Sequence, residues 1–313
     1  MRIPLAELVQ TTTKAIQSYG FNDKETERIR EVLLYAQLRG NNQGVVKLIG
    51  QGIPKREGSK APGIVRETPV SALVDGNRTH AIVVMDYLTD LAVQKAKASH
   101  VGIAGSFNTE ESTGALGYYT NRIATQGLIG FAFASAPYQT TAPHGSNQAR
   151  FCTNPLSCGV PTSTDPVILD MSTSVMAYYG LIEAKTAGRQ VPPDFGFDAE
   201  GRPTTDPAQI MAGALRTIAG RKGSGLAFMV QVLAGAFVRA DSFDNASDNS
   251  GNLVMAIDPE IFMDVNEFRS RVSELGSRVK SARKADGVEE IFLPGESGNK
   301  LTRRYLESGE VEI

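Results

Sequence analysis

Short apolar runs alternate with segments of helical periodicity through the middle of this 313-residue chain. The strand candidates are residues 70–74, 103–107, 128–135 and 167–170, and the helix candidates are residues 80–98, 114–126 and 174–187. Regular alternation of these two patterns is typical of α/β proteins, in which helices pack on a sheet. The sequence therefore predicts an α/β fold for this region.

The N-terminal third predicts helices. Asn22 and Glu25 have the spacing of a capping box, which marks the start of a helix. Four apolar residues then fall on one face of that helix, which we expect to end at Gly40: Ile29, Val32, Leu33 and Ala36. This face should pack on the core.

The C-terminal third contains the clearest helical pattern, over residues 222–238. Its large apolar residues form one stripe, which we expect to face the core: Leu226, Met229, Val230, Leu233 and Phe237. Residues 252–257 predict a strand, and residues 259–284 predict a long surface helix rich in charged side chains.

The composition bounds the functional classes. A net charge of −2 gives no electrostatic reason to expect nucleic acid or a membrane surface as a partner. No apolar stretch reaches the ~18 residues that span a bilayer, and residues 1–10 lack the features of a signal peptide, so we expect a cytoplasmic protein. Cys152 and Cys158 are too few for a disulfide framework and are predicted to be buried free thiols.

The standard signatures of several enzyme classes are missing. The sequence has no Gly-x-Gly-x-x-Gly motif for a Rossmann site, no P-loop motif and no Gly-x-Ser-x-Gly hydrolase motif. Its three scattered histidines, His80, His100 and His144, do not suggest a His-rich metal site.

Three polar clusters remain, each at the end of a predicted loop. They are Thr153-Asn154-Pro155, Asp170-Met171-Ser172-Thr173-Ser174 and Gly220-Arg221-Lys222-Gly223-Ser224-Gly225. Hydroxyl groups and free N–H groups at a helix N-terminus attract phosphate, and Lys222 would add a positive charge. Taken singly, however, Ser172 or Ser174 is an ordinary helix cap and the glycine run an ordinary turn.

The order of these and other segments along the chain resembles the type 2 malate/L-lactate dehydrogenase family, also called the sulfolactate dehydrogenase-like family. The matching segments are residues 114–119 (GALGYY), 152–155 (CTNP), 170–174 (DMSTS), 187–192 (AGRQVP), 198–201 (DAEG), 204–207 (TTDP), 222–225 (KGSG) and 293–296 (LPGE). The stretch 187–201 looks most like the 2,3-diketo-L-gulonate reductase branch of that family.

The resemblance implies a non-Rossmann, mixed-sheet fold that binds NAD or NADP, and a homodimer with cofactor and substrate near the subunit interface. It implies a helical part at residues 1–70 that carries the substrate segment and packs with residues 240–313, and an NAD(P)-binding α/β domain at residues 71–239. The residues it assigns to the cofactor are Thr153, Asn154, Ile168, Leu169, Asp170, Met171, Ser172, Thr173, Ser174, Lys222, Gly223, Glu296, Ser297 and Gly298.

The chain departs from the family at the segment that supplies the proton. The family reads Ser-His-Gly followed by an Arg, whereas this chain reads Asn42-Gln43-Gly44 followed by Lys47. An amide donates a hydrogen bond but delivers no proton near neutral pH, and a lysine lacks the bidentate geometry of arginine. A second family histidine is also absent, from residues 108–113.

Three explanations stay open. The substrate could be a protonated imine, which needs only hydride. Another residue could supply the proton, with His144 the first candidate and Glu110 and Glu111 weaker ones, while His80 and His100 are expected to be structural. Third, the chain could bind a dinucleotide without normal turnover or run a different redox reaction in a biosynthetic pathway.

The sequence thus predicts an NAD(P)H-dependent oxidoreductase that reduces the C=O or C=N group of a small carboxylated substrate, either a 2-oxo acid or a cyclic ketimine acid. Gln43 and Asn42 would hydrogen-bond the reacting group, and Lys47 would hold the carboxylate. The competing prediction is a non-catalytic or mechanistically divergent dinucleotide-binding protein. Neither prediction decides between NAD and NADP, and neither includes a metal ion.

Overall fold

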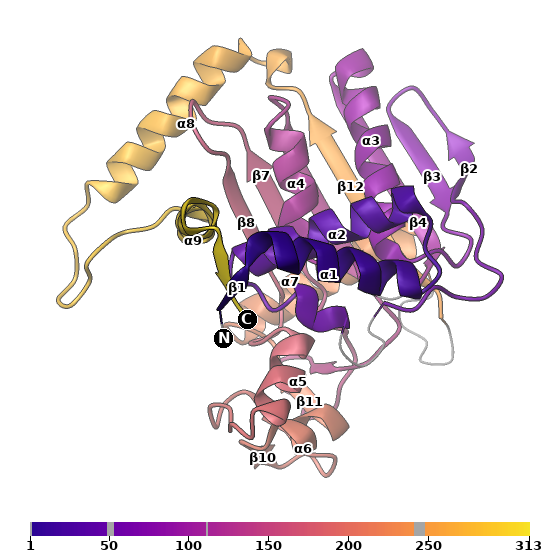
Figure 1. The fold of residues 1–313 in the computed structure, drawn as a ribbon, viewed down its shortest axis with the longest axis vertical. Coiled ribbons are helices and arrows are strands. Elements are labelled where there is room, and N and C mark those ends of the chain that lie inside the picture. The colour runs from indigo at the N-terminus through magenta and orange to yellow at the C-terminus, as the bar shows by residue number, and fades with distance from the viewer. Residues whose placement is uncertain (1, 49–52, 111, 241–247) are drawn as a thin grey trace.

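A mixed seven-stranded sheet forms the centre of the molecule (Figure 1), in the strand order β2-β3-β4-β12-β5-β7-β8. The structure is a computed structural model that describes residues 2–48, 53–110, 112–240 and 248–313. The strands are β2 (Gly63–Glu67), β3 (Ser71–Asp75), β4 (Val101–Thr109), β5 (Ile129–Ser135), β7 (Leu156–Val160), β8 (Val167–Met171) and β12 (Ser250–Ile257). β3 and β4 pair in parallel, and the other neighbouring strands pair antiparallel. In this order, β8 is one of the edge strands.

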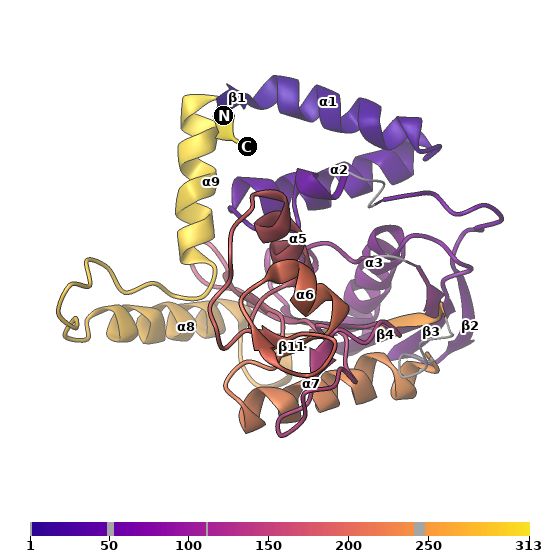
Figure 2. The ribbon, with the colours of Figure 1, turned by 90° about the horizontal axis from the view of Figure 1, so that it is seen from below.

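Helices cover both faces of this sheet (Figure 2). α3 (Ala81–Ser99) and α4 (Leu116–Ala124) pack on one face, and α7 (Arg221–Ala234) with the short helix η2 (Ala236–Val238) packs on the other. The larger core lies under α3 and α4 and includes Met85, Leu88, Leu116 and Val254. Val238 and Leu253 belong to a smaller core on the opposite face.

A second, smaller unit is built mainly from the residues that follow β8, together with β6, which precedes it. It contains a four-stranded sheet in the order β10-β9-β11-β6 and a core of its own around Leu181 and Ile210. Its elements are β6 (Thr141–Ala142), α5 (Tyr178–Thr186), β9 (Gly196–Phe197), β10 (Pro203–Thr204), α6 (Pro207–Ala212) and β11 (Ala214–Arg216).

The two terminal parts of the chain pack together. β1 (Arg2–Pro4) pairs with β13 (Glu310–Glu312), and α9 (Glu296–Ser308) crosses the end of α2 (Asp23–Leu38). The remaining helices are α1 (Leu5–Ser18), η1 (Val45–Leu48), η3 (Pro259–Ile261) and α8 (Val265–Lys280), and α8 extends away from the body (Figure 1). Because β12 lies between β4 and β5, the central sheet also includes residues outside the predicted 71–239 domain.

Several predictions about local structure are confirmed. Asn22 accepts a hydrogen bond from the Glu25 N–H at 2.9 Å, and the Glu25 carboxylate accepts one from the Asn22 N–H at 2.9 Å, so the capping box is present. The four apolar residues that follow it on α2 are all fully buried. Both cysteines are free thiols, but they are only half-buried.

The prediction that the large apolar stripe of residues 222–238 faces the core holds for Val230 and Leu233 and is wrong for the other three residues. Leu226, Met229 and Phe237 are 38%, 50% and 65% exposed. The buried face of α7 consists mainly of small residues: Gly223, Ala227, Val230 and Ala234. Small side chains let the helix approach the sheet so closely that a Cβ at Gly251 would lie 2.1 Å from the Ala234 carbonyl oxygen.

Two predicted helices begin later than expected. Ser174 forms a bridge with Thr217 and the Val175 N–H donates to Arg216 at the end of β11, so α5 begins only at Tyr178 and its N-cap is Ala177. Ser172 and Ser174 are therefore not helix caps. In the C-terminal part, Asp264 caps α8, which runs only over Val265–Lys280 instead of residues 259–284.

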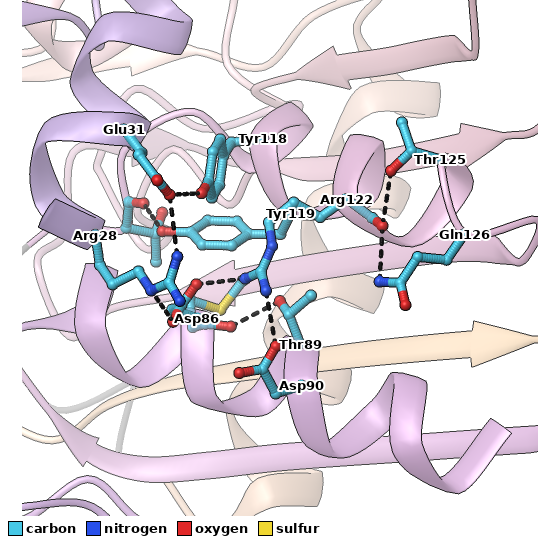
Figure 3. Close-up of polar contacts among 12 residues, drawn as sticks. Arg28, Glu31, Asp86, Thr89, Asp90, Tyr118, Tyr119, Arg122, Thr125 and Gln126 are labelled. Atoms are coloured by element: carbon cyan, nitrogen blue, oxygen red, sulfur yellow. Dashed lines mark hydrogen bonds and ion pairs between the residues drawn. The ribbon is translucent and has the colours of Figure 1, made fainter. Parts of the chain in front are cut away.

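An ion-pair network ties α2, α3 and α4 together (Figure 3). Asp86 on α3 contacts Arg28 on α2 at 3.2 Å and also pairs with Arg122 on α4. The Tyr118 hydroxyl on α4 donates to Glu31 on α2 at 2.5 Å. Burial raises the pKa of Asp86, and the two arginines oppose that rise. The network therefore fixes the position of α2 over the two helices that cover the sheet.

We expect Arg122→Met to lower the free energy of unfolding by about 1–3 kcal/mol, because it removes one of the two cations that compensate the buried Asp86 carboxylate. Urea denaturation near pH 7 measures the change. Asp90→Asn is the control: it breaks the pair between Arg122 and the 58% exposed Asp90, which should cost less than about 1 kcal/mol. Equal effects of the two substitutions would contradict a special role for Asp86.

Candidate active site

A pocket of about 760 Å³ lies where the N-terminal loop, the central sheet and the smaller unit meet. Most of its wall comes from residues 39–43, 112–116, 134–136, 138, 140, 152, 153, 155 and 170–172. Residues 177–179 at the start of α5 and Ser250 and Asn252 from β12 also line it. Polar groups from distant parts of the sequence thus converge on one concave, partly apolar site, as is typical of small-molecule sites.

The loop after α2 brings Asn42 and Gln43 into this pocket, as the sequence predicts for the substrate segment. The Gln43 amide donates to Asn42 Oδ1 at 3.3 Å, and the Gln43 N–H donates to Asn41 Oδ1 at 2.9 Å. Gly44 follows, where a Cβ would lie 2.6 Å from Gln37 Oε1. Only glycine lets the loop fold back on α2, and this fold orients the two amides.

Asp170, at the end of β8, is the acidic residue of the pocket wall. Its Oδ2 accepts a hydrogen bond of 2.9 Å from the N–H of Gly117, in the first turn of α4. Among the described residues, no cation lies within ion-pair distance of this carboxyl group. Burial raises the pKa of Asp170 to about 6, and the Gly117 N–H opposes part of that rise. Asp170 can therefore hold or release a proton close to neutral pH.

Lys47 is fully buried and does not line the pocket. Its ammonium group donates to Ser112 Oγ at 2.7 Å and lies 3.5 Å from the centre of the Tyr179 ring. Ser112 and Tyr179 both belong to the pocket wall, so Lys47 lies directly behind that wall. The predicted direct contact of Lys47 with a substrate carboxylate would require this wall to move.

His144 is exposed and does not line the pocket. Its backbone N–H donates to Ser224 Oγ at 3.1 Å, and its ring lies against Gly220 at the start of α7. His144, the first candidate for the proton donor in the sequence analysis, therefore lies near the Lys222-Gly223 segment and not beside Gln43. Lys222 is exposed at the same helix N-terminus.

The residues assigned to the cofactor divide into two groups. Thr153, Asp170, Met171 and Ser172 line the pocket. Others build the support behind it. Thr173 Oγ1 donates to the carbonyl groups of Thr153 and Asn154, and the Asn154 side chain donates to Ala227 and Gln231 on α7. Ser174 Oγ donates to the Met176 carbonyl group.

The third cofactor segment lies beside a second pocket. Glu296, which pairs with Lys280, lines a pocket of about 480 Å³ together with residues 162–167 and Arg303. Gly298 packs against the Arg39 side chain. Ile168 is buried at the start of the same strand that carries Asp170, Leu169 is partly exposed, and Ser297 lies in the first turn of α9.

The other titratable candidates have structural partners. Glu110 is buried between Arg56 and Arg78, at 2.6 and 2.5 Å, and Glu111 lies outside the described residues. His80 caps α3 by accepting from the Ile82 N–H, and burial with the nearby Lys47 charge lowers its pKa to about 3. His100 pairs with Asp258 at 3.0 Å.

Sequence reasoning missed Arg39, Tyr178, Tyr179 and Asn252. Arg39 lies directly before Gly40, and a basic residue at the end of a helix is usually explained by the helix dipole alone. In the structure it lines the first pocket, with its guanidinium 3.6 Å from the centre of the Tyr35 ring. The two tyrosines of α5 reach the site because their helix begins late.

Comparison with known proteins identifies the family. A family model described as malate/L-lactate dehydrogenase matches residues 3–313. The chain belongs to this family of oxidoreductases. It is 32% identical to the L-sulfolactate dehydrogenase of Methanothermobacter thermautotrophicus, an alignment that covers 100% of this chain and 93% of that protein. It is 29% identical to Delta(1)-pyrroline-2-carboxylate reductase 2 of Burkholderia multivorans, over 91% of this chain and 90% of that protein.

A solved structure of a malate dehydrogenase has the same fold as this chain. Malate dehydrogenase from Entamoeba histolytica superposes with a TM-score of 0.92 at 22% identity, covering 100% of this chain and 94% of that one. The predicted non-Rossmann, mixed-sheet α/β fold is thereby confirmed. No helix in the described part of the chain is long and apolar enough to cross a membrane.

The residues present fit a nicotinamide dinucleotide. The cofactor is an anion with a flat aromatic group at each end, and the site offers two pockets along the edge strand β8. The half-buried Arg39 has no carboxylate within ion-pair distance among the described residues, so its charge is available to a bound anion. When bound, the reduced dinucleotide supplies a hydride.

Asp170 should reduce the stability of the folded protein at neutral pH. Its pKa is about 6 when folded and 3.8 when unfolded, so folding is penalised once the carboxyl group ionises. The penalty is absent below pH 3.8 and complete above pH 6, where it reaches up to about 3 kcal/mol. Asp170→Asn keeps an oxygen for the Gly117 N–H and should therefore raise stability at pH 7.5.

Urea denaturation of Asp170→Asn at pH 7.5 and at pH 4 measures this effect. We expect a gain of about 1–3 kcal/mol at pH 7.5 and a much smaller one at pH 4. Asp194→Asn, at an exposed position, is the control and should change stability at neither pH. A loss of stability on Asp170→Asn at pH 7.5 would contradict the raised pKa.

Proposed function

We propose that this protein is an NAD(P)H-dependent reductase of the C=O or C=N group of a small carboxylated substrate. One observation carries the proposal: the first pocket joins the Asn42-Gln43 amides to the Asp170–Ser172 end of β8. The relatives support the substrate class, since their names include a sulfolactate dehydrogenase and a pyrroline-carboxylate reductase. The choice between NADH and NADPH is left to direct measurement.

Gln43 and Asn42 act in this proposal as hydrogen-bond donors to the oxygen or nitrogen of the reacting group. They orient that atom and stabilise the negative charge that develops on a carbonyl oxygen during reduction. Neither amide supplies the proton. A protonated cyclic ketimine already carries its proton, so its reduction is complete after hydride transfer.

For a 2-oxo acid, we propose Asp170 as the proton donor in place of the family's histidine. The Asp170 carboxylic acid transfers its proton to the carbonyl oxygen as the hydride reaches the carbonyl carbon, which gives the hydroxyl product and the Asp170 carboxylate. Solvent then reprotonates the carboxylate. The raised pKa of Asp170 suits this exchange, because a general acid works best when its pKa is near the operating pH.

Reduction assays at pH 5–9 with a panel of 2-oxo acids and cyclic ketimine acids test this proposal. With an active 2-oxo acid, kcat should fall about tenfold per pH unit above pH 6, as the acid form of Asp170 is lost. Asp170→Asn should lower kcat by about 10²–10⁴ and remove this dependence. With a protonated ketimine, the same substitution should have a mild effect.

His144→Ala is the companion variant and should leave kcat nearly unchanged, because His144 does not line the pocket. A tenfold or greater loss with saturating substrate would make His144 the donor instead. Tight NAD(P)H binding without turnover of any substrate in the panel would favour the competing function, a non-catalytic dinucleotide-binding protein.

We also propose that the protein acts as a cytoplasmic homodimer. Exposed large apolar side chains on α7 and the following η2 support the dimer, because exposed apolar groups of this kind often mark an interface: Leu226, Met229 and Phe237. The free thiols of Cys152 and Cys158 suit a reducing compartment.

Met229→Glu combined with Phe237→Glu should convert the dimer to a monomer, because each substitution places a charge in the proposed interface. Light scattering coupled to size-exclusion chromatography measures the mass. Phe262→Glu, at an 86% exposed position after η3, is the control and should leave the dimer intact. A wild-type monomer, or a double variant that stays dimeric, would refute this interface.

A further inference from the structure

Arg39 occupies the boundary between the two pockets. Its side chain lines the first pocket, and its Nη2 donates at 2.9 Å to Asn299 Oδ1, a residue that lines the second. The long stem of Arg39 also packs against Gly298, where a Cβ would lie 3.0 Å from Arg39 Cγ. The guanidinium is therefore held in place from three sides, by Tyr35, Gly298 and Asn299.

The charge of Arg39 is poorly compensated by the protein. Burial lowers its pKa, and only the Tyr35 ring and the Asp165 carboxylate, the latter beyond ion-pair distance, oppose this among the described residues. The guanidinium nevertheless stays charged at neutral pH. By contrast, the cations of the second pocket have acidic partners: Arg303 pairs with Asp165 and Lys280 with Glu296. A bound anion would compensate the charge of Arg39.

The two pockets lie at opposite ends of one edge strand. Asp170 and Met171, at the end of β8, line the first pocket, and Val167, at its start, lines the second. Five residues of strand span roughly 13 Å from the first Cα to the last, which is the scale of an extended dinucleotide. The lining of the second pocket is rich in hydroxyl groups, suited to a nucleoside: Thr162, Ser163, Thr164, Ser273 and Ser277.

We propose that Arg39 is the anchor for the pyrophosphate of the dinucleotide, which would lie along β8 with its nicotinamide half in the first pocket and its adenosine half in the second. This inference rests on the proposed function and adds the site of the phosphate groups. A substrate carboxylate is the other anion that Arg39 could meet. The phosphate is favoured because Arg39 lies between two pockets, and a small substrate needs only one.

Calorimetric or fluorescence titrations with NADH, NADPH, ADP and adenosine test the proposal on the full chain. Arg39→Met keeps the packing of the stem on Tyr35 and removes the charge. We expect it to weaken binding of the preferred dinucleotide and of ADP by about 10- to 100-fold each, because charge-assisted hydrogen bonds to phosphate are lost. Adenosine, which has no phosphate, should bind the variant and the wild type equally well. The affinity of Arg39→Lys for the dinucleotide and ADP should lie between those of Arg39→Met and the wild type.

Arg30→Met is the matched control. Arg30 lies on α2, the helix that ends just before Arg39, and its guanidinium contacts Thr13 at 3.3 Å, away from both pockets. Its removal should not change the affinity for any of these ligands. Circular dichroism and thermal melting establish that each variant is folded, and if Arg39→Met is not, Arg39→Lys decides between the outcomes.

Unchanged affinity of the Arg39 variants for the dinucleotide and ADP would overturn the proposal. So would a rise confined to the substrate KM at saturating dinucleotide, since that result would assign Arg39 to the substrate carboxylate. Failure of the proposed function has a different signature, because the wild-type protein itself would then bind neither NADH nor NADPH.

Discussion

The position of α2 determines what the site contains. Asp86 holds α2 and α4 together through Arg28 and Arg122, and the network is anchored on α3, which covers the sheet. The last turn of α2 leads directly into Arg39 and the Asn42-Gln43 loop. The first turn of α4 supplies the N–H that orients Asp170. One ion-pair network thus sets the spacing between the amides, the cation and the acid of the pocket.

Asp170 combines two opposing effects. Loss of solvent raises its pKa, whereas the N–H at the start of α4 stabilises the carboxylate. A paired cation would remove the remaining penalty, but it would also hold the carboxyl group permanently ionised. An acid without an ion pair costs stability at neutral pH and in return keeps a proton available. Such a cost is common at functional sites and has no benefit for folding alone.

The sequence was sufficient for features that depend on local patterns. The capping box at Asn22 and the buried face of α2 follow from spacing alone, and both are confirmed. The α7 stripe shows where periodicity fails. A pattern identifies the apolar face of a helix, but it does not say whether that face meets the chain's own sheet. In α7, the face that meets the sheet consists mainly of small residues. Nor could the sequence pattern show that β12 lies between β4 and β5, because the partners of a strand are set by the tertiary fold.

The site was only partly predictable for a related reason. Family resemblance located Asn42, Gln43 and the Asp170–Ser172 segment, all of which line the pocket. It could not show that Lys47 is buried behind Ser112, or that the ring of His144 lies against Gly220 at the far helix. Arg39 had no sequence signal, because two of its three partners, Gly298 and Asn299, come from α9, some 260 residues away.

The surroundings of His80 keep this histidine neutral. Lys47 lies behind the pocket wall, and its charge already lowers the pKa of the buried His80. With Nδ1 accepting from the Ile82 N–H, His80 carries its proton on Nε2, which has no hydrogen-bond partner among the residues that the structure describes. It therefore does not exchange a proton with the pocket. The amide of Gln43, by contrast, keeps its hydrogen-bond donors at any pH. Under the proposed function, the proton comes from the carboxyl group of Asp170 or from the substrate itself.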